Sequence, residues 1–527
     1  MPVSTDHSRS RRRAPSLSEL RRAYDRSRGF ADEISAEASG AGSTDLSDFW
    51  REIFAERPNL PAFNDMLVMR RGFTYPLADR AKVDDRDAER AYATGAYDVV
   101  SKSVPSEFLA SVEESSVGAP ITFEFGRTSL TAGGIVNALT AYRIVRWCKD
   151  RGLAGRPLRV LEIGPGYGQV AAQLFGRLNI QSYTTCDLLE NLFLGSFYLQ
   201  ATLPEEPARF VGSDEPVQPH EGFTFTLPPF LNSVRGPFDL IINSYSFQEM
   251  NKESVVEYFA YAEQNLADDG LFFSFNAHGK AGIEVASDYP THLFELCGLS
   301  APRKYPWQLF GTVPYELVMI ARKVPLTDGE REAASSVLDG LAGAMQLGLG
   351  DQLGYLCDRL VQGQLEARDR DALDAINAVV CGAGPELKLA AAQKLRSACR
   401  TAGVGEFFEG CLEFAGDTGA ASDALACAAD LLDDSHAAVI AHAALAAAAV
   451  DRRTAHVHLR EVELAAPHLA AEVAASSRTR RLIFALIAQR LNIGGQAQPP
   501  GLLGKLRVAA RARSRQTSPR TALRRRP

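Results

Sequence analysis

Nine consecutive residues decide the fold of this 527-residue chain: Val160-Leu161-Glu162-Ile163-Gly164-Pro165-Gly166-Tyr167-Gly168. The run is apolar up to its fourth residue apart from one acid, and glycine then stands at every second position. A glycine backbone can approach a ligand closely, and the N–H groups at the start of a helix have no partner within that helix. The stretch therefore predicts a strand, a ligand-binding turn and the beginning of a helix.

Apolar, strand-like segments alternate with helix-like segments between residues 157 and 324. The expected strands are 158–163, 182–186, 238–243, 271–275 and 317–321. A turn is expected at 268–270, and residues 303–323 read as a strand pair that reverses around Gly311. The alternation predicts an α/β fold with a doubly wound, Rossmann-like sheet and helices on both faces.

The rest of the chain divides by composition. Residues 1–45 and 494–527 carry many arginines and few large apolar side chains, which predicts disordered basic tails. Residues 46–156 are expected to form a mostly helical region that covers the active site and includes a helix capped by Thr131. Residues 325–493 are rich in Ala and Leu and predict an all-helical C-terminal domain, which loosely matches degenerate helical repeats and offers a surface for a protein partner or a homo-oligomer.

Charge and cysteine content exclude several classes of protein. The 57 Lys and Arg residues and the 64 Asp and Glu residues give a net charge of −7, and the basic residues gather at the two ends. An acidic body is unsuited to binding nucleic acid. No apolar run is long enough to span a bilayer, the eight cysteines form no C-x-x-C pair, and no cluster of side chains has metal-ligand spacing. We expect a cytoplasmic protein without disulfides, a metal or an integral membrane segment.

The spacing of the glycines bears on the cofactor. Gly164, Gly166 and Gly168 follow a G-x-G-x-G pattern, whereas the dinucleotide-binding turn places its third glycine one residue later. Together with Glu162, the turn resembles the first motif of class I S-adenosylmethionine-dependent methyltransferases. The resemblance implies that Glu162 faces the methionine ammonium group of the cofactor. Asp187, 21 positions after Gly166 at the end of the next strand, can accept hydrogen bonds from two ribose hydroxyls, a role that NAD-binding sheets share.

A second run extends the resemblance: Phe238-Asp239-Leu240-Ile241-Ile242-Asn243-Ser244-Tyr245-Ser246-Phe247-Gln248-Glu249-Met250. It is similar to the fourth-strand signature of the sugar O-methyltransferase family, and the similarity covers roughly residues 115–323. The resemblance implies an enzyme that methylates a hydroxyl of a sugar or a sugar-containing small molecule. Further cofactor contacts are expected at Leu188, Asn243 and Ser244, and acceptor contacts at Gln248 and Asn276.

Methyl transfer to a hydroxyl is helped by a general base, because an alkoxide is too basic to form unaided. Glu249 and His278 are the candidates, since both follow strand ends over the expected pocket. Each has a second interpretation: Glu249 can cap the helix that begins near Lys252, and His278 can be a surface-loop histidine. His292 is expected on a helix and in a structural role.

Two questions stay open at the level of sequence. The third strand is either 209–213, which would place Asp214 at the adenine, or 223–228. The function also has alternatives, namely an inactive methyltransferase-like scaffold whose helical domain binds a partner, or an NAD-dependent reductase on the same fold.

Overall fold

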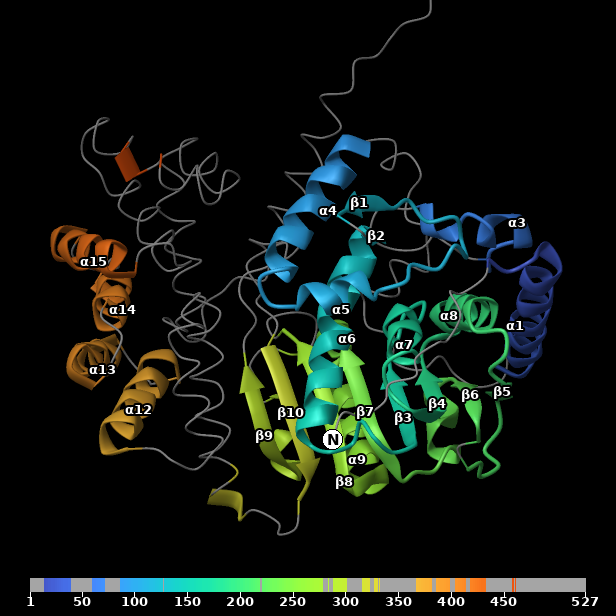
Figure 1. Ribbon diagram of the computed structural model, residues 1–527. Helices are drawn as coiled ribbons and strands as arrows, with labels where there is room; N and C mark the ends of the chain where they lie inside the picture. Colours follow the sequence, from blue (N-terminus) through green and yellow to red (C-terminus); the bar gives the residue numbers. More distant parts are fainter. Residues whose placement is uncertain are drawn as a thin grey trace, which may run out of the picture.

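The structure is a computed structural model (Figure 1). It describes residues 14–38, 59–71, 86–126, 128–218, 220–277, 283, 288–300, 315–322, 327–329, 331, 366–381, 385–398, 403–413, 418–432, 457–458 and 460.

An eight-stranded sheet forms the centre of the described part. Its strands are β3 (Leu158–Ile163), β4 (Ile180–Cys186), β5 (Ala208–Val211), β6 (Gly222–Thr226), β7 (Phe238–Ser244), β8 (Leu266–Asn276), β9 (Phe294–Ser300) and β10 (Tyr315–Ala321). They lie in the order β5-β6-β4-β3-β7-β8-β10-β9. All neighbours from β5 to β8 pair in parallel, and β10 is antiparallel to both β8 and β9. The predicted α/β sheet with a reversed strand near its end is confirmed.

The central strands form because most of their residues on both faces are buried and many of these are apolar. In β7 and β8, for example, Leu240, Ile242, Leu271 and Phe273 are at most 1% exposed. Such near-continuous apolar runs are typical of parallel strands that are covered on both faces. The covering helices are α6 (Ala132–Asp150), α7 (Gln169–Leu174), α8 (Leu189–Thr202) and α9 (Lys252–Asn265), with α6 in front of the sheet in Figure 1.

Helix α6 is held at both ends. At its start, the Thr131 side chain accepts a hydrogen bond from the Gly134 N–H at 2.8 Å, which confirms the predicted cap. Near its end, the Trp147 Nε1–H donates to Glu316 Oε1 of β10 at 2.6 Å, and Arg143 lies 3.3 Å from Glu316 Oε2. The reversed strand therefore fixes the position of α6 over the sheet.

The N-terminal region contains more structure than its composition predicts. Helix α1 (Leu17–Ala38) lies within the segment expected to be a disordered tail, so that prediction is wrong for this stretch. Ala23, Ser27, Ala31 and Ile34 recur at helical spacing and are at most 4% exposed, because this face packs against α8. The composition is misleading because most charged residues of this helix are exposed, while a short face of small and apolar residues makes the contact.

The segment that follows supplies short elements next to the sheet. They are α3 (Phe63–Met66), the 3₁₀ turn η1 (Met69–Arg71), α4 (Arg86–Val100), α5 (Ser106–Ala110) and the hairpin β1 (Phe123–Phe125) and β2 (Thr128–Leu130). These helices agree with the expected mostly helical cover, and Figure 1 shows α4, α5 and the hairpin beyond the carboxyl ends of the strands.

Three local details differ from the expectation. The expected turn at 268–270 falls inside the bounds of β8, at an irregularity where the pairing with β7 passes from Leu266 directly to Leu271. The reversed pair does not begin after Arg303, because its first strand, β9, already starts at Phe294. His292 lies in a 3₁₀ turn, η6 (Thr291–Leu293), rather than on a longer helix, since strand pairing with β10 captures the residues that follow.

Four helices are described in the C-terminal region: α12 (Ala367–Cys381), α13 (Pro385–Ala398), α14 (Val404–Glu413) and α15 (Thr418–Leu432). Each packs against the next one in sequence. They agree with the expected helical content, whereas a repeat array across 325–493 and a partner or oligomer surface there stay predictions. The predicted tail 494–527 lies outside the described residues. Among the described helices, none is long and apolar enough to cross a membrane.

Candidate functional site

A cavity of about 600 Å³ opens where the parallel strands end. Its lining includes Gly164 after β3, Asp187 after β4, Pro228 after β6 and Tyr245 after β7. Helix α9 adds a further side, and Asn137 of α6 closes another. Ligands of doubly wound sheets bind at this edge, where neighbouring crossovers leave in opposite directions. The cavity is therefore the candidate site.

The three predicted glycines are required for different physical reasons. All have positive φ, at +67° for Gly164, +58° for Gly166 and +86° for Gly168. A Cβ on Gly164 would meet the Ser246 side chain, and one on Gly168 would lie 2.8 Å from Leu199. A Cβ on Gly166 would meet no atom of the described residues within 4 Å. Gly164 and Gly166 line the cavity, whereas Gly168 is the N-cap of α7 and does not.

Asp187 lines the cavity, and its carboxylate accepts three hydrogen bonds. Its Oδ2 accepts from the Gly166 N–H at 2.9 Å, and its Oδ1 accepts from the Leu188 N–H at 2.7 Å and from Asn191 Nδ2 at 3.1 Å. Burial raises the pKa of Asp187 to about 7, although these hydrogen bonds oppose the shift. The carboxylate thus ties the glycine turn to α8 and faces the cavity, as does Leu188.

Glu162 is not where the sequence analysis expects it. Its side chain is 1% exposed, lies outside the cavity lining and accepts a hydrogen bond from the Tyr183 hydroxyl at 2.7 Å. Burial raises its pKa to about 7. The residue lies within β3, whose side chains alternate between the faces of the sheet, and this alternation turns Glu162 into the packed layer.

Asn243, Gln248 and Asn276 form a buried polar cluster behind the cavity rather than part of its wall. Asn276 Nδ2 donates to Asn243 Oδ1 at 2.7 Å, and Asn243 Nδ2 donates to the Ile163 carbonyl at 2.8 Å. Gln248 Oε1 accepts from the Ala277 N–H at 3.0 Å. These bonds hold the segment 244–250 against the glycine turn. Asn243, Gln248 and Asn276 therefore do not line the cavity themselves, contrary to the expectation, but hold in place Ser244 and Ser246, which do line it.

The candidate general bases differ in where the structure places them. Glu249, at the end of the 3₁₀ turn η4 (Phe247–Glu249), lines the cavity. It does not cap α9, because the Asn251 side chain accepts from the Ser254 N–H and takes that position. His278 lies outside the described residues. His292 is absent from the cavity lining.

The strand order decides which of the two candidate segments is the third strand. β6 pairs with β4, whereas β5 lies at the sheet edge, so 223–228 contains the third strand of the inner sheet. Asp214 is exposed and does not line the cavity. The turn after β6, η3 (Pro228–Ser233), lines the cavity instead.

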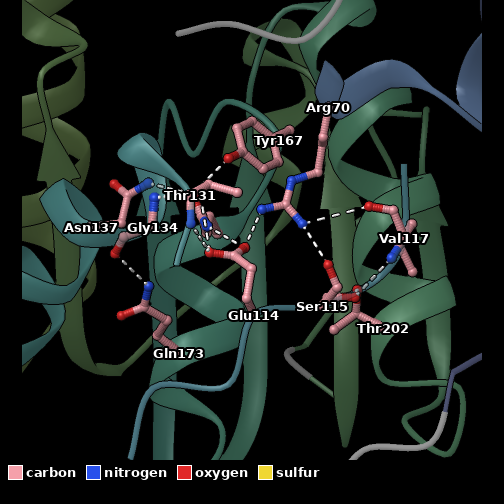
Figure 2. A network of polar contacts seen from close by, with 11 residues as sticks. Arg70, Glu114, Ser115, Val117, Thr131, Gly134, Asn137, Tyr167, Gln173 and Thr202 are labelled. Atoms are coloured by element: carbon pink, nitrogen blue, oxygen red, sulfur yellow. Dashed lines mark hydrogen bonds and ion pairs between the residues drawn. The ribbon is translucent and has the colours of Figure 1, made fainter. Parts of the chain in front are cut away.

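A buried ion pair from the N-terminal region backs the glycine turn. Arg70 of η1 pairs with Glu114, and their side chains are 2% and 5% exposed. Arg70 also donates to the Ser115 carbonyl at 2.9 Å and stacks 5.5 Å from the centre of the Tyr167 ring (Figure 2). Glu114 Oε2 accepts from the Thr131 N–H at 3.1 Å. Residues 44 positions apart are thus brought together beside the turn.

From Glu114 a chain of hydrogen bonds leads to the cavity wall. Gln169 Nε2 donates to Glu114 Oε1 at 2.9 Å. Gln169 Oε1 accepts from Asn137 Nδ2 at 2.8 Å and from the Tyr167 hydroxyl at 2.6 Å. Asn137, Tyr167 and Gln169 all line the cavity.

Sequence analysis missed several lining residues. Asn137 is one of several polar residues on α6, and no sequence signal marks it. Ser254, Tyr258 and Tyr261 of α9 line the cavity and are spaced four and three apart. That spacing places the three side chains on one face of the helix, and it was the available signal.

The charges of the lining are one-sided. Four of its described residues are acidic, namely Asp187, Glu249, Glu253 and Glu257, and none is Lys, Arg or His. A cofactor that carries positive charge fits this set of groups. The volume also falls in the usual range of ligand pockets, about 300–1,000 Å³. Among the described residues no group of three or more potential ligands could hold a metal ion.

Comparisons with known proteins give distant similarities. Searches against family models and against curated proteins find no match. Among solved structures, the chain is similar to magnesium protoporphyrin IX methyltransferase from Synechocystis PCC 6803 with bound SAM, at 14% identity and a TM-score of 0.28, over 36% of this chain and 81% of that one. It is also similar to a SAM-dependent methyltransferase from Leishmania major (11%, TM-score 0.25, 43% and 82%) and to TrmK from M. capricolum in complex with S-adenosylhomocysteine (10%, 0.27, 48% and 98%). At these identities and scores no family is assigned, and the description of the fold rests on the strand order above.

Proposed function

We propose that this chain is an S-adenosylmethionine-dependent O-methyltransferase whose acceptor is a hydroxyl of a sugar or sugar-containing small molecule. The observation that carries the proposal is the cavity at the strand ends, where the G-x-G-x-G turn meets a lining with four carboxylates, Asp187 among them, and no described cation. The bound cofactor would supply an electrophilic methyl group on a positively charged sulfur.

The same lining argues against a dinucleotide. A pyrophosphate carries negative charge and is bound by helix N-termini or by basic side chains. Here the Gly166 N–H already donates to Asp187, so this N–H of the glycine turn is not available to a phosphate. Carboxylates near a phosphate would repel it, whereas they attract a sulfonium or an ammonium group. These charges favour a methyltransferase over the alternative reductase.

The residues of the site would divide the work. Asp187 would accept hydrogen bonds from the ribose hydroxyls, and Gly166 leaves room for the ligand because no described atom lies within 4 Å of its missing Cβ. Tyr258 and Tyr261 of α9 and the turn after β6 offer apolar surface next to polar groups, which suits a nucleoside.

The acceptor end would lie near β7, where Ser244, Ser246 and Glu249 line the cavity. Glu249 is proposed as the base that takes the hydroxyl proton, and His278 is the second candidate. A sugar presents several hydroxyls, and the serine and carboxylate groups here can hydrogen-bond to them. Alignment of the acceptor oxygen with the bond to sulfur would supply most of the rate enhancement.

The first test is calorimetric titration of the purified chain with S-adenosylmethionine and, separately, with NADH. Binding of the first alone is the expected result, and a panel of sugars is then assayed for transfer of a radiolabelled methyl group. Binding of NADH alone would overturn the proposal in favour of the reductase. Binding of neither would favour the inactive scaffold.

A further inference from the structure

The hydrogen-bond chain of Figure 2 fixes the orientation of an amide at the cavity wall. Glu114 is paired with Arg70, and an ionised carboxylate only accepts hydrogen bonds. The Gln169 amide must therefore turn its nitrogen to Glu114, as it does at 2.9 Å. Its oxygen is then left for Tyr167 and Asn137, so both of these must donate.

Asn137 is the last member of this chain. Its nitrogen is committed to Gln169 Oε1 at 2.8 Å, which leaves the amide oxygen to meet a ligand. Orientations of amides are decided by such networks, and here every link follows from the fixed polarity of Glu114. The wall therefore presents a hydrogen-bond acceptor, and it selects a ligand group that donates.

The position of Asn137 indicates which part of a ligand it meets. Asp187 follows β4, and the turn at Pro228 follows β6 on one side of it. Gly164 follows β3 and Tyr245 follows β7 on the other side. Asn137 lies on this side, because it bonds to Gln169 at the start of α7, directly after the β3 turn, and because α6 contacts α7 and β8. A nucleoside anchored at Asp187 with its base toward β6 places its remaining substituent toward β3 and β7.

We propose that the Asn137 side-chain oxygen accepts a hydrogen bond from the α-ammonium group of the cofactor's amino-acid end, and that Arg70, Glu114 and Gln169 are the positioning residues that set its orientation. This inference rests on the proposed function. It gives Asn137 the task that the sequence assigned to Glu162, which faces Tyr183 instead.

The test compares three ligands by calorimetry on the full chain. S-adenosylhomocysteine carries the whole amino-acid end, decarboxylated S-adenosylmethionine keeps only its amino group, and 5′-methylthioadenosine lacks both groups. In Asn137→Ala, the first two should bind about tenfold or more weakly, because a hydrogen bond to a charged group is lost, while the third should bind as before.

Asn191→Ala is the matched control. Asn191 lines the same cavity but donates to Asp187 at 3.1 Å, so its loss should weaken all three ligands alike. Equal weakening of all three in Asn137→Ala, or of none, would overturn the inference. Weakening of S-adenosylhomocysteine alone would assign Asn137 to the carboxylate and overturn it as well. A wild-type chain that binds none of the three would overturn the proposed function itself.

Discussion

Replacement of Glu162 by Gln should stabilise the protein, and increasingly so as the pH rises. Burial raises the pKa of Glu162 to about 7 from its ordinary value of 4.5, and the bond from Tyr183 only partly opposes this. Because the native state holds the proton to higher pH than the unfolded chain does, the stability from this group is fully present below pH 4.5 and is lost as the pH rises through 7. The cost of ionisation is about 1 kcal/mol at pH 5.5 and about 3 kcal/mol at pH 8.5. Gln keeps the size of the side chain and an oxygen for Tyr183, but it does not ionise.

Urea unfolding at pH 5.5 and 8.5 measures this difference. The advantage of Glu162→Gln over wild type should be about 2 kcal/mol larger at the higher pH. Tyr183→Phe is the control, because it keeps the carboxyl and removes its donor, and it should lose more stability at pH 8.5 than at pH 5.5. Since Glu162 does not line the cavity, cofactor affinity should not change. An advantage that is independent of pH, or a variant less stable than wild type at pH 8.5, would refute the reasoning.

Three further predictions concern the cavity and its support. Gly166→Arg should abolish cofactor binding with the circular dichroism spectrum unchanged, because Gly166 lines the cavity and no described atom lies within 4 Å of its missing Cβ; normal affinity in calorimetry would contradict the placement of the site. Glu249→Gln should lower kcat by a factor of about 10² to 10⁴ and leave cofactor affinity nearly unchanged, and the same holds for His278→Ala if that residue is the base instead; unchanged turnover would remove the residue from the mechanism. Glu114→Gln should cost about 3–5 kcal/mol in urea unfolding, since it leaves Arg70 charged and buried, and adding Arg70→Met should recover part of this loss; strictly additive effects would show that the two side chains are not coupled.

The sheet could be predicted because its signals are local. The run at 158–163 coincides with β3, and the strands expected at 182–186 and 238–243 fall within β4 and β7. The failures come from contacts that are distant in sequence. Helix α1 depends on α8, and the early start of β9 depends on its pairing with β10. Neither partner is visible in the local pattern.

The site was predictable where one backbone segment forms it. Gly164, Gly166 and Asp187 belong to consecutive strand ends, and all three line the cavity. Glu162 was misplaced because the spacing of a motif gives a residue's position along a strand, while the face it points to depends on what packs there. Asn137 was missed because its role depends on Glu114 and Arg70, which approach it only in the folded chain.

The reversed strand β10 also has a consequence for synthesis on the ribosome. β9 joins the sheet only through β10, which pairs with β8 on its other side. Until residues 315–321 have left the exit tunnel, β8 has an open edge of unpaired backbone groups, and β9 has no strand to join. Exposed edges of this kind recruit other chains. The nascent protein therefore passes through a window, between about residue 276 and residue 321, in which binding of a chaperone should matter most for its yield.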